Sequence, residues 1–179
     1  MTKHKLTIFD IDGTLCNRDE TELLPRRKEM LDELNLDGRQ IAIATNQGGV
    51  GYRLFRQSRN KTFEVYPTEQ DVLERMAAII ENIGRPVPLN IAFSYYVEWA
   101  KSWSPIPEGR EAEPYWRTDF RKPGGGMLLD HMHALNVPPS QTIYVGDRPE
   151  DEGAAQAAGC DFAWAWDYFG DPKEPEKRD

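Results

Sequence analysis

Cysteine is scarce in this sequence, with only Cys16 and Cys160 among its 179 residues. Two cysteines so far apart do not form a disulfide framework, and no CxxC pair is present to indicate a zinc site. No apolar run approaches the roughly 20 residues needed to cross a bilayer. Residues 1–5 are polar and lack the features of a secretory signal. We therefore expect reduced thiols and a cytoplasmic protein that does not enter the membrane.

Basic residues are also in short supply, with 22 lysines and arginines against 30 acidic residues and a net charge of −8. This balance argues weakly against broad binding to nucleic acid or anionic membrane, although it permits a local basic pocket. The length suits one domain. We expect a monomer with a single domain over residues 1–169 and a flexible, charged tail over residues 170–179.

Short apolar segments alternate with helical patterns along the chain. Strands are predicted at residues 5–9, 40–44, 89–95, 142–145 and 162–166, and helices at 25–34, 68–83, 126–135 and 149–158. Residues 46–66 and 96–123 are predicted to be long loops. The alternation predicts an α/β fold, a Rossmann-like doubly wound parallel sheet with helices on both faces. Such sheets bind ligands outside the carboxyl ends of their strands.

Two carboxylates, Asp10 and Asp12, follow the first predicted strand. Residues two apart in an extended chain point the same way. Because like charges at this separation repel, the pair requires a cation or a shared proton. Taken alone, such a pair is more often a solvated acidic turn.

Further polar residues lie after other predicted strands or in a loop that reaches the same edge. Thr45 and Asn46 can bind phosphate oxygens, Lys122 can neutralise their charge, and Asp147 and Asp151 straddle a helix start. Each has an ordinary alternative: a helix cap, a solvated lysine, or acidic residues that complement a helix dipole. Together they indicate a phosphoryl-transfer site in which carboxylates bind Mg²⁺.

These residues resemble the four motifs of the haloacid dehalogenase (HAD) superfamily. The resemblance spans residues 5–166 and consists of Asp10-x-Asp12-Gly13-Thr14-Leu15, Thr45-Asn46, Lys122-Pro123 and Gly146-Asp147-x-x-x-Asp151. The runs Thr45-Asn46-Gln47-Gly48-Gly49 and Arg121-Lys122-Pro123 are similar to one branch of it. That branch holds histidinol-phosphate and heptose-bisphosphate phosphatases and the phosphatase domain of polynucleotide kinase-phosphatases.

The resemblance implies a role for each matching residue. Asp10 would be the nucleophile that forms an aspartyl-phosphate, and Asp12 would protonate the leaving oxygen and later activate water. Thr45 and Lys122 would hold the phosphoryl group. The implied ligands of Mg²⁺ are Asp10, the main-chain carbonyl of Asp12, and Asp147. Asp151 would support the metal through water or orient Lys122.

Two departures from these relatives leave the substrate open. Residues 95–121 contain no cysteine or histidine, so the zinc loop of several sugar phosphatases is absent. The glycine loop also carries its arginine, Arg53, at a shifted position.

The roughly thirty residues between the first two motifs are too few for a folded cap. We therefore expect little or no cap domain.

Residues 96–121 are expected to form either a substrate-facing loop or a surface loop held in place by its aromatic side chains. The candidate substrate-binding residues are Asn46, Arg117 and Arg121. The preferred substrate is a small phosphorylated metabolite or nucleotide, because the acidic balance disfavours a long polyanion. A nucleic-acid 3′-end is the alternative, since an open site and aromatic residues suit a terminal base. Two further alternatives are a phosphomutase and a non-catalytic phosphoacceptor or binding module.

Overall fold

The computed structural model describes residues 4–172 and places a five-stranded parallel sheet at their centre. The strands are β1 (Leu6–Phe9), β2 (Gln40–Asn46), β3 (Leu89–Ala92), β6 (Thr142–Gly146) and β7 (Asp161–Trp164). Their order is β3-β2-β1-β6-β7. After β3 the chain crosses β1 to form β6 on its other side, so the strand order reverses at β1. The end of β1 is therefore the expected ligand-binding edge.

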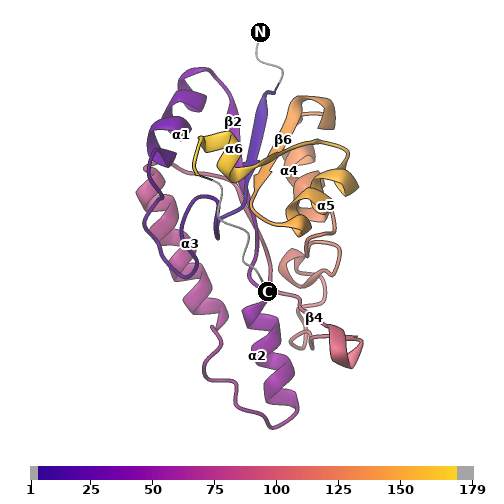
Figure 1. Cartoon of the computed structure of the whole chain (residues 1–179). Helices are drawn as coiled ribbons and strands as arrows, with labels where there is room; N and C mark the ends of the chain where they lie inside the picture. Colours follow the sequence, from indigo (N-terminus) through magenta and orange to yellow (C-terminus); the bar gives the residue numbers. More distant parts are fainter. Residues whose placement is uncertain (1–3, 173–179) are drawn as a thin grey trace.

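Helices cover both faces of the sheet (Figure 1). The face formed by Phe9, Ile41 and Ile43 packs against α1 (Arg27–Leu36), α3 (Glu69–Ile83) and α6 (Ala165–Phe169). The opposite face, with Leu6 and Ile8, packs against α4 (Gly126–Ala134) and α5 (Pro149–Ala158). Alternate residues of each central strand thus enter opposite cores. The predicted doubly wound α/β fold is confirmed.

Local signals place several helix ends where the sequence predicts them. Thr68 caps α3 through a capping box with Asp71, and Gly84 ends that helix with a φ of 81°. Helix α5 begins with Pro149 at its first position and ends before Gly159, whose φ is 72°.

Three predictions about local structure are wrong. The predicted strand over residues 89–95 ends at Ala92. Residues 46–66 are not one long loop, because Gly49–Ser58 form helix α2. The predicted strand over residues 162–166 ends at Trp164, and Ala165 and Trp166 begin α6. The last two errors arise where short-range signals are weak, at a glycine-rich start and in a brief aromatic run.

Small elements stand beyond the carboxyl ends of the strands. Helix α2 projects there, and the hairpin of β4 (Tyr96–Val97) and β5 (Ser102–Trp103) lies beside it (Figure 1). This insert is small, as expected for a protein with little or no cap. No helix within residues 4–172 is long and apolar enough to cross a membrane. Most of the predicted tail lies outside the described residues, but Asp171 pairs with the buried Arg27.

Candidate active site

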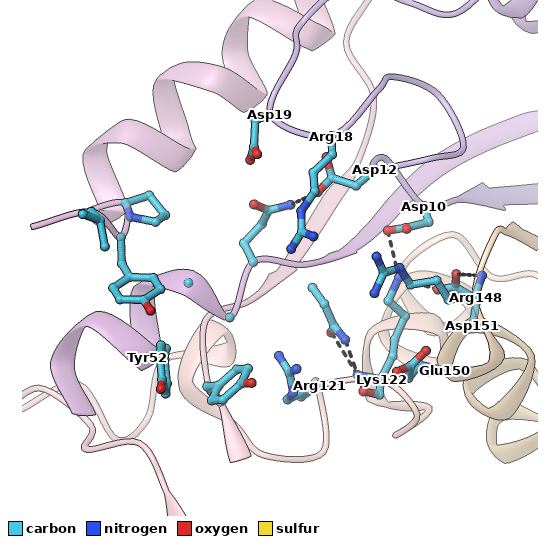
Figure 2. Close-up of a pocket in the computed structure, with 18 residues that line it drawn as sticks. Asp10, Asp12, Arg18, Asp19, Tyr52, Arg121, Lys122, Arg148, Glu150 and Asp151 are labelled. Carbon is cyan, nitrogen blue, oxygen red and sulfur yellow. Dashed lines mark hydrogen bonds and ion pairs between the residues drawn. The ribbon is translucent and has the colours of Figure 1, made fainter. Parts of the chain in front are cut away.

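A cavity of about 500 Å³ opens at the carboxyl ends of the central strands. Figure 2 shows Asp10, Lys122 and Asp151 gathered at one end of it and Tyr52 at the other. Its walls come from the loops after β1, β2 and β3, the first turn of α2, the segments before α3 and α4, and the start of α5. The sequence-predicted residues that line it are Asp10, Asp12, Asn46, Arg121, Lys122 and Asp151.

Lys122 lies at the centre of the buried end, with its side chain 3% exposed. Its ammonium nitrogen is 2.8 Å from Asp10 Oδ1 and 2.6 Å from Asp151 Oδ1. It also donates to the hydroxyl of Tyr144, 2.6 Å away, and to the carbonyl of Ala44 at 3.2 Å. Burial alone would lower the pKa of Lys122, but the charges of the two carboxylates outweigh it and raise that pKa. Lys122 is therefore a fixed cation beside Asp10.

Three carboxylates meet around this lysine. One oxygen from each of Asp10, Asp147 and Asp151 lies within 4.8 Å of the others. Burial raises the pKa of Asp10 to about 6 against the opposing charge of Lys122. Burial, reinforced by Asp10 and Asp151, raises the pKa of Asp147 to about 7. The group therefore carries more negative charge than Lys122 alone neutralises.

Asp147 has the features of a metal-binding carboxylate. Its Oδ1 is buried and accepts no hydrogen bond from the described residues. Gly13 lies so close that an added Cβ would be 2.2 Å from Asp147 Oδ2, and its φ is +80°. Only glycine lets the chain after β1 pass this carboxylate. Hard carboxylate oxygens of this kind fit Mg²⁺, so the donor set matches the predicted metal.

Asp151 has a different environment from the other two carboxylates. Its Oδ2 accepts the backbone N–H groups of Asp147 at 3.1 Å and Arg148 at 3.0 Å, at the start of α5. Its Oδ1 accepts from Lys122 and from Tyr144. Since both oxygens are engaged, the contacts favour the predicted role of orienting Lys122 over direct metal binding.

Asp12 points away from the carboxylate group. Its Oδ2 accepts a hydrogen bond from Gln47 Nε2 at 3.0 Å, and its Oδ1 is paired with Arg75 at 2.6 Å. The same Gln47 nitrogen is 3.0 Å from the hydroxyl of the buried Thr45. Asp12 and Thr45, both predicted to act on the phosphoryl group, are therefore connected through one side chain.

The three candidate substrate-binding residues differ in position. Asn46 bonds the backbone of Lys122 twice, with its Nδ2 to the carbonyl at 3.2 Å and its Oδ1 to the N–H at 3.0 Å. This holds the lysine loop against β2. Arg117 is exposed, pairs with Asp119, and does not line the cavity. Its role in substrate binding stays a prediction.

Arg121 is the candidate that faces the cavity. Its guanidinium lies 4.6 Å from the ring centre of Tyr95, and its hydrogen bond to the carbonyl of Ser94 is long, at 3.4 Å. Burial lowers its pKa. A Cβ on Gly48 would be 2.4 Å from Arg121 Nη1, so the glycine makes room for it. No carboxylate of the described residues forms an ion pair with Arg121, which leaves its charge available to a ligand.

The far end of the cavity is aromatic. Tyr52 contacts Tyr66 edge-on with ring centres 4.9 Å apart, and Tyr95 at 5.1 Å. Val65 and Pro67 complete this wall, and the Val65 side chain is exposed. The pocket thus joins a charged reacting end to a wall suited to the apolar part of a substrate.

Sequence reasoning missed Gln47, Arg75 and Tyr144. The alternation that relates Asp10 to Asp12 could have revealed Gln47, two residues after Thr45. Tyr144 lies within an apolar strand, and Arg75 lies on a polar helix face 63 residues after Asp12. No local pattern distinguishes either from an ordinary core or surface residue.

Comparisons with known proteins agree with this geometry. The family model described as polynucleotide kinase 3 phosphatase matches residues 5–172. A heptose-1,7-bisphosphate 7-phosphatase of Haemophilus ducreyi is 26% identical over 162 residues, which cover 87% of this chain and 79% of that protein. A heptose-1,7-bisphosphate 7-phosphatase of Rhodopseudomonas palustris is 26% identical over 148 residues, or 83% of this chain and 72% of that protein.

Solved structures share the fold. The heptose-1,7-bisphosphate phosphatase of B. bronchiseptica, complexed with magnesium and phosphate, aligns with a TM-score of 0.56 at 21% identity, covering 96% of this chain and 89% of that one. A candidate HAD-like phosphatase of Mesorhizobium loti aligns with a TM-score of 0.60 at 18% identity, covering 91% and 71%. The chain is a HAD-type phosphatase, a phosphoric monoester hydrolase, and it belongs to the polynucleotide kinase 3 phosphatase family.

Proposed function

We propose that the protein is a Mg²⁺-dependent phosphatase that hydrolyses a small phosphorylated metabolite or nucleotide through a phosphoryl group carried on Asp10. The observation that carries the proposal is the group of buried Asp10 and Asp151 and half-buried Asp147 around Lys122, at the floor of an open cavity of about 500 Å³. A phosphoacceptor module would not need the second carboxylate, Asp12, at the same strand end.

The reaction has two steps. In the first, a carboxylate oxygen of Asp10 bonds to phosphorus while the bond from phosphorus to the leaving oxygen breaks, and Asp12 gives that oxygen a proton. In the second, a water oxygen bonds to phosphorus, its proton passes to Asp12, and the bond to Asp10 breaks. The first step needs Asp10 ionised and Asp12 protonated, and the second needs Asp12 ionised so that it can accept a proton from water.

The surrounding residues hold charge and geometry for both steps. Lys122 and the hydroxyl of Thr45 would bind the phosphoryl oxygens, and Asn46 and Asp151 fix Lys122 in place. Asp10, Asp147 and the main-chain carbonyl of Asp12 would hold Mg²⁺, with Asp151 nearby. The ion supplies positive charge where negative charge concentrates in the transition state.

We expect activity to require Mg²⁺. Asp147→Asn should raise the Mg²⁺ concentration needed for half-maximal rate about tenfold or more, because the variant loses a charged metal ligand. Mg²⁺ should also raise the melting temperature of the wild type by relieving carboxylate repulsion, and raise it less in the variant. Glu152→Gln, which neutralises another acidic residue in the first turn of α5, is the control. Full activity after exhaustive chelation would contradict the metal role. Ca²⁺ should bind but support little turnover.

We expect Arg121 to recognise a charged or polar group of the substrate away from the reacting phosphate. Arg121→Ala should raise KM for the physiological substrate about tenfold or more, the loss expected for a charged hydrogen bond, and change KM for p-nitrophenyl phosphate much less. Arg117→Ala, at the other candidate arginine of the same segment, which lies outside the cavity lining, is measured beside it. Equal effects of Arg121→Ala on both substrates would show that Arg121 does not read the substrate.

A nucleic-acid 3′-end is the second candidate substrate. The description of the matching family model and the aromatic wall of Tyr52, Tyr66 and Tyr95 both favour it, since aromatic rings stack on bases. The net charge of −8 opposes it. The relatives described as heptose-bisphosphate phosphatases favour a phosphorylated sugar.

The deciding experiment measures kcat/KM for a 3′-phosphorylated oligonucleotide, mononucleotides and sugar phosphates at one moderate salt concentration. The proposal expects a small substrate to be hydrolysed best, with little effect of added salt. A large preference for the oligonucleotide that salt suppresses would establish the end-processing function instead.

A further inference from the structure

Arg75 contacts Asp12 at the carboxyl edge of the sheet, although its helix carries none of the four HAD motifs. It lies on α3, and its Nη2 is 2.6 Å from Asp12 Oδ1. The Arg75 side chain is 13% exposed and that of Asp12 is 25% exposed, so the pair is partly shielded from water. A charge-assisted contact of this length in a shielded site restricts the orientation of both groups.

The same guanidinium also binds the loop between β1 and α1. Its Nε and Nη2 donate to the carbonyl of Glu20 at 3.0 and 2.9 Å, and Nη2 lies 3.4 Å from the carbonyl of Asn17. Between these two residues lie Arg18 and Asp19, which line the cavity. One planar group therefore fixes Asp12 relative to the loop that forms one wall of the pocket.

The other oxygen of Asp12 is held from the opposite side by Gln47. With a partner on each oxygen, the carboxylate has one orientation rather than several. Its oxygens still have unused lone pairs, because an ionised carboxylate offers about four acceptor positions. A proton can therefore be carried on a side that neither partner occupies.

We propose that Arg75 is a positioning residue, which acts through Asp12 to align it for proton transfer to the leaving oxygen. The inference rests on the proposed role of Asp12. Arg75 does not line the cavity, so it has no direct contact with substrate to confuse the result. The competing explanation is that Arg75 only ties the loop after β1 to α3.

The chain offers a control that separates these explanations. Asn82, also on α3, donates from its Nδ2 to the carbonyl of Thr21 at 2.9 Å. It ties the same loop to the same helix and forms no hydrogen bond with Asp12. Asn82→Ala therefore weakens the loop attachment and leaves the contacts of Asp12 intact.

The test compares p-nitrophenyl phosphate with phenyl phosphate, two similar esters whose leaving groups differ in acidity. Phenol is the weaker acid, so its departure depends more on a donated proton. For both substrates kcat/KM reports the steps through leaving-group departure, and the ratio of the two values does not depend on the folded fraction of a preparation. Wild type, Asp12→Asn, Arg75→Gln, Arg75→Lys and Asn82→Ala are measured at one pH.

Arg75→Gln is expected to lower kcat/KM for phenyl phosphate about tenfold or more beyond its effect on p-nitrophenyl phosphate. General acid catalysis contributes roughly 10²- to 10⁴-fold to a rate, so this loss corresponds to part of the contribution of Asp12. Asp12→Asn should shift the ratio in the same direction. Arg75→Lys should restore part of it, because the ammonium can reach Asp12 but lacks the fork that also binds Glu20. Asn82→Ala should leave the ratio as in wild type.

A wild-type ratio in Arg75→Gln, with a shifted ratio in Asp12→Asn, would overturn the inference and leave the proposed function standing. A shift of equal size in Asn82→Ala would also overturn it, in favour of the loop tie. An unshifted ratio in Asp12→Asn would instead show that Asp12 does not protonate the leaving group, and the proposed mechanism would fail with the inference.

Discussion

Asp10→Asn is expected to lower turnover by about 10³-fold or more while the protein remains folded, on the scale seen when catalytic nucleophiles are removed. The amide is nearly isosteric with the carboxylate but is a poor nucleophile. Lys122 keeps its contacts with Asp151, Tyr144 and the carbonyl of Ala44, so the site retains its shape. The measurement is steady-state hydrolysis of p-nitrophenyl phosphate, with mass spectrometry to exclude deamidation back to Asp.

Stability provides a second measurement on the same variant. Burial raises the pKa of Asp10 from 3.8 to about 6, so its folded pKa lies above its unfolded one. Its ionisation therefore removes stability from the metal-free protein as pH rises from about 4 to about 6, and that loss persists at higher pH. The neutral amide carries no such cost. Near pH 7 the melting temperature of metal-free Asp10→Asn should equal or exceed that of wild type.

Substantial activity in pure Asp10→Asn would remove Asp10 from the reaction. A large fall in its melting temperature would instead show that the carboxylate is needed for folding, so that lost activity alone could not identify a nucleophile. Glu81→Gln, at an exposed acidic residue of α3 away from the cavity, controls for the general effect of neutralising one carboxylate.

The sequence predicts the parts of this protein that depend on near neighbours in the chain. Alternating apolar strands and helices determine the layers. The positions just after strands determine where Asp10 and Asp147 meet and place Asp12 at the same edge of the sheet. Parallel strands bring their carboxyl ends to one edge whatever the loop details, so this part of the site follows from topology.

Helix α2 shows why other parts are not predictable in this way. Its glycines suggest a loop, because glycine is unfavourable inside a helix. The structure gives a different reason for Gly51, since an added Cβ would be 2.4 Å from the carbonyl oxygen of Phe93. The glycine permits close packing of the helix against the segment after β3, and Val50 and Phe55 are buried there. Tertiary packing has overridden local propensity.

The polar network around Lys122 is predictable only in part. The motif resemblance implies that Asp151 orients Lys122 or supports the metal, but Tyr144 contacts the lysine from 22 residues further along the chain without any such signal. An apolar strand that contains tyrosine gives no sign that its hydroxyl faces a buried ammonium. Lys122 itself was recognisable by its motif, but how many groups depend on it was not.

That dependence leads to the second large effect, expected for Lys122→Met. Lys122 is the cation bonded to both Asp10 and Asp151, and their side chains are 8% and 2% exposed. Breaking a buried ion pair from one side typically costs about 3–5 kcal/mol, since the remaining charges stay buried without a partner. We expect a destabilisation of about that size in the metal-free protein, together with loss of turnover by about 10²-fold or more, because charge on the phosphoryl group is no longer neutralised.

Charge compensation distinguishes the two losses. Asp10→Asn/Lys122→Met removes one negative charge together with the lysine, so it should recover much of the stability lost by Lys122→Met and none of the activity. Mg²⁺ should also stabilise Lys122→Met without restoring turnover, since it binds the carboxylates but cannot replace a donor at the phosphoryl group. Urea unfolding with and without Mg²⁺, beside steady-state kinetics, measures both. Wild-type stability and activity in Lys122→Met would show that the buried charge group is not the reacting centre. A fall in activity alone would show that Lys122 serves the phosphoryl group without holding the carboxylates together.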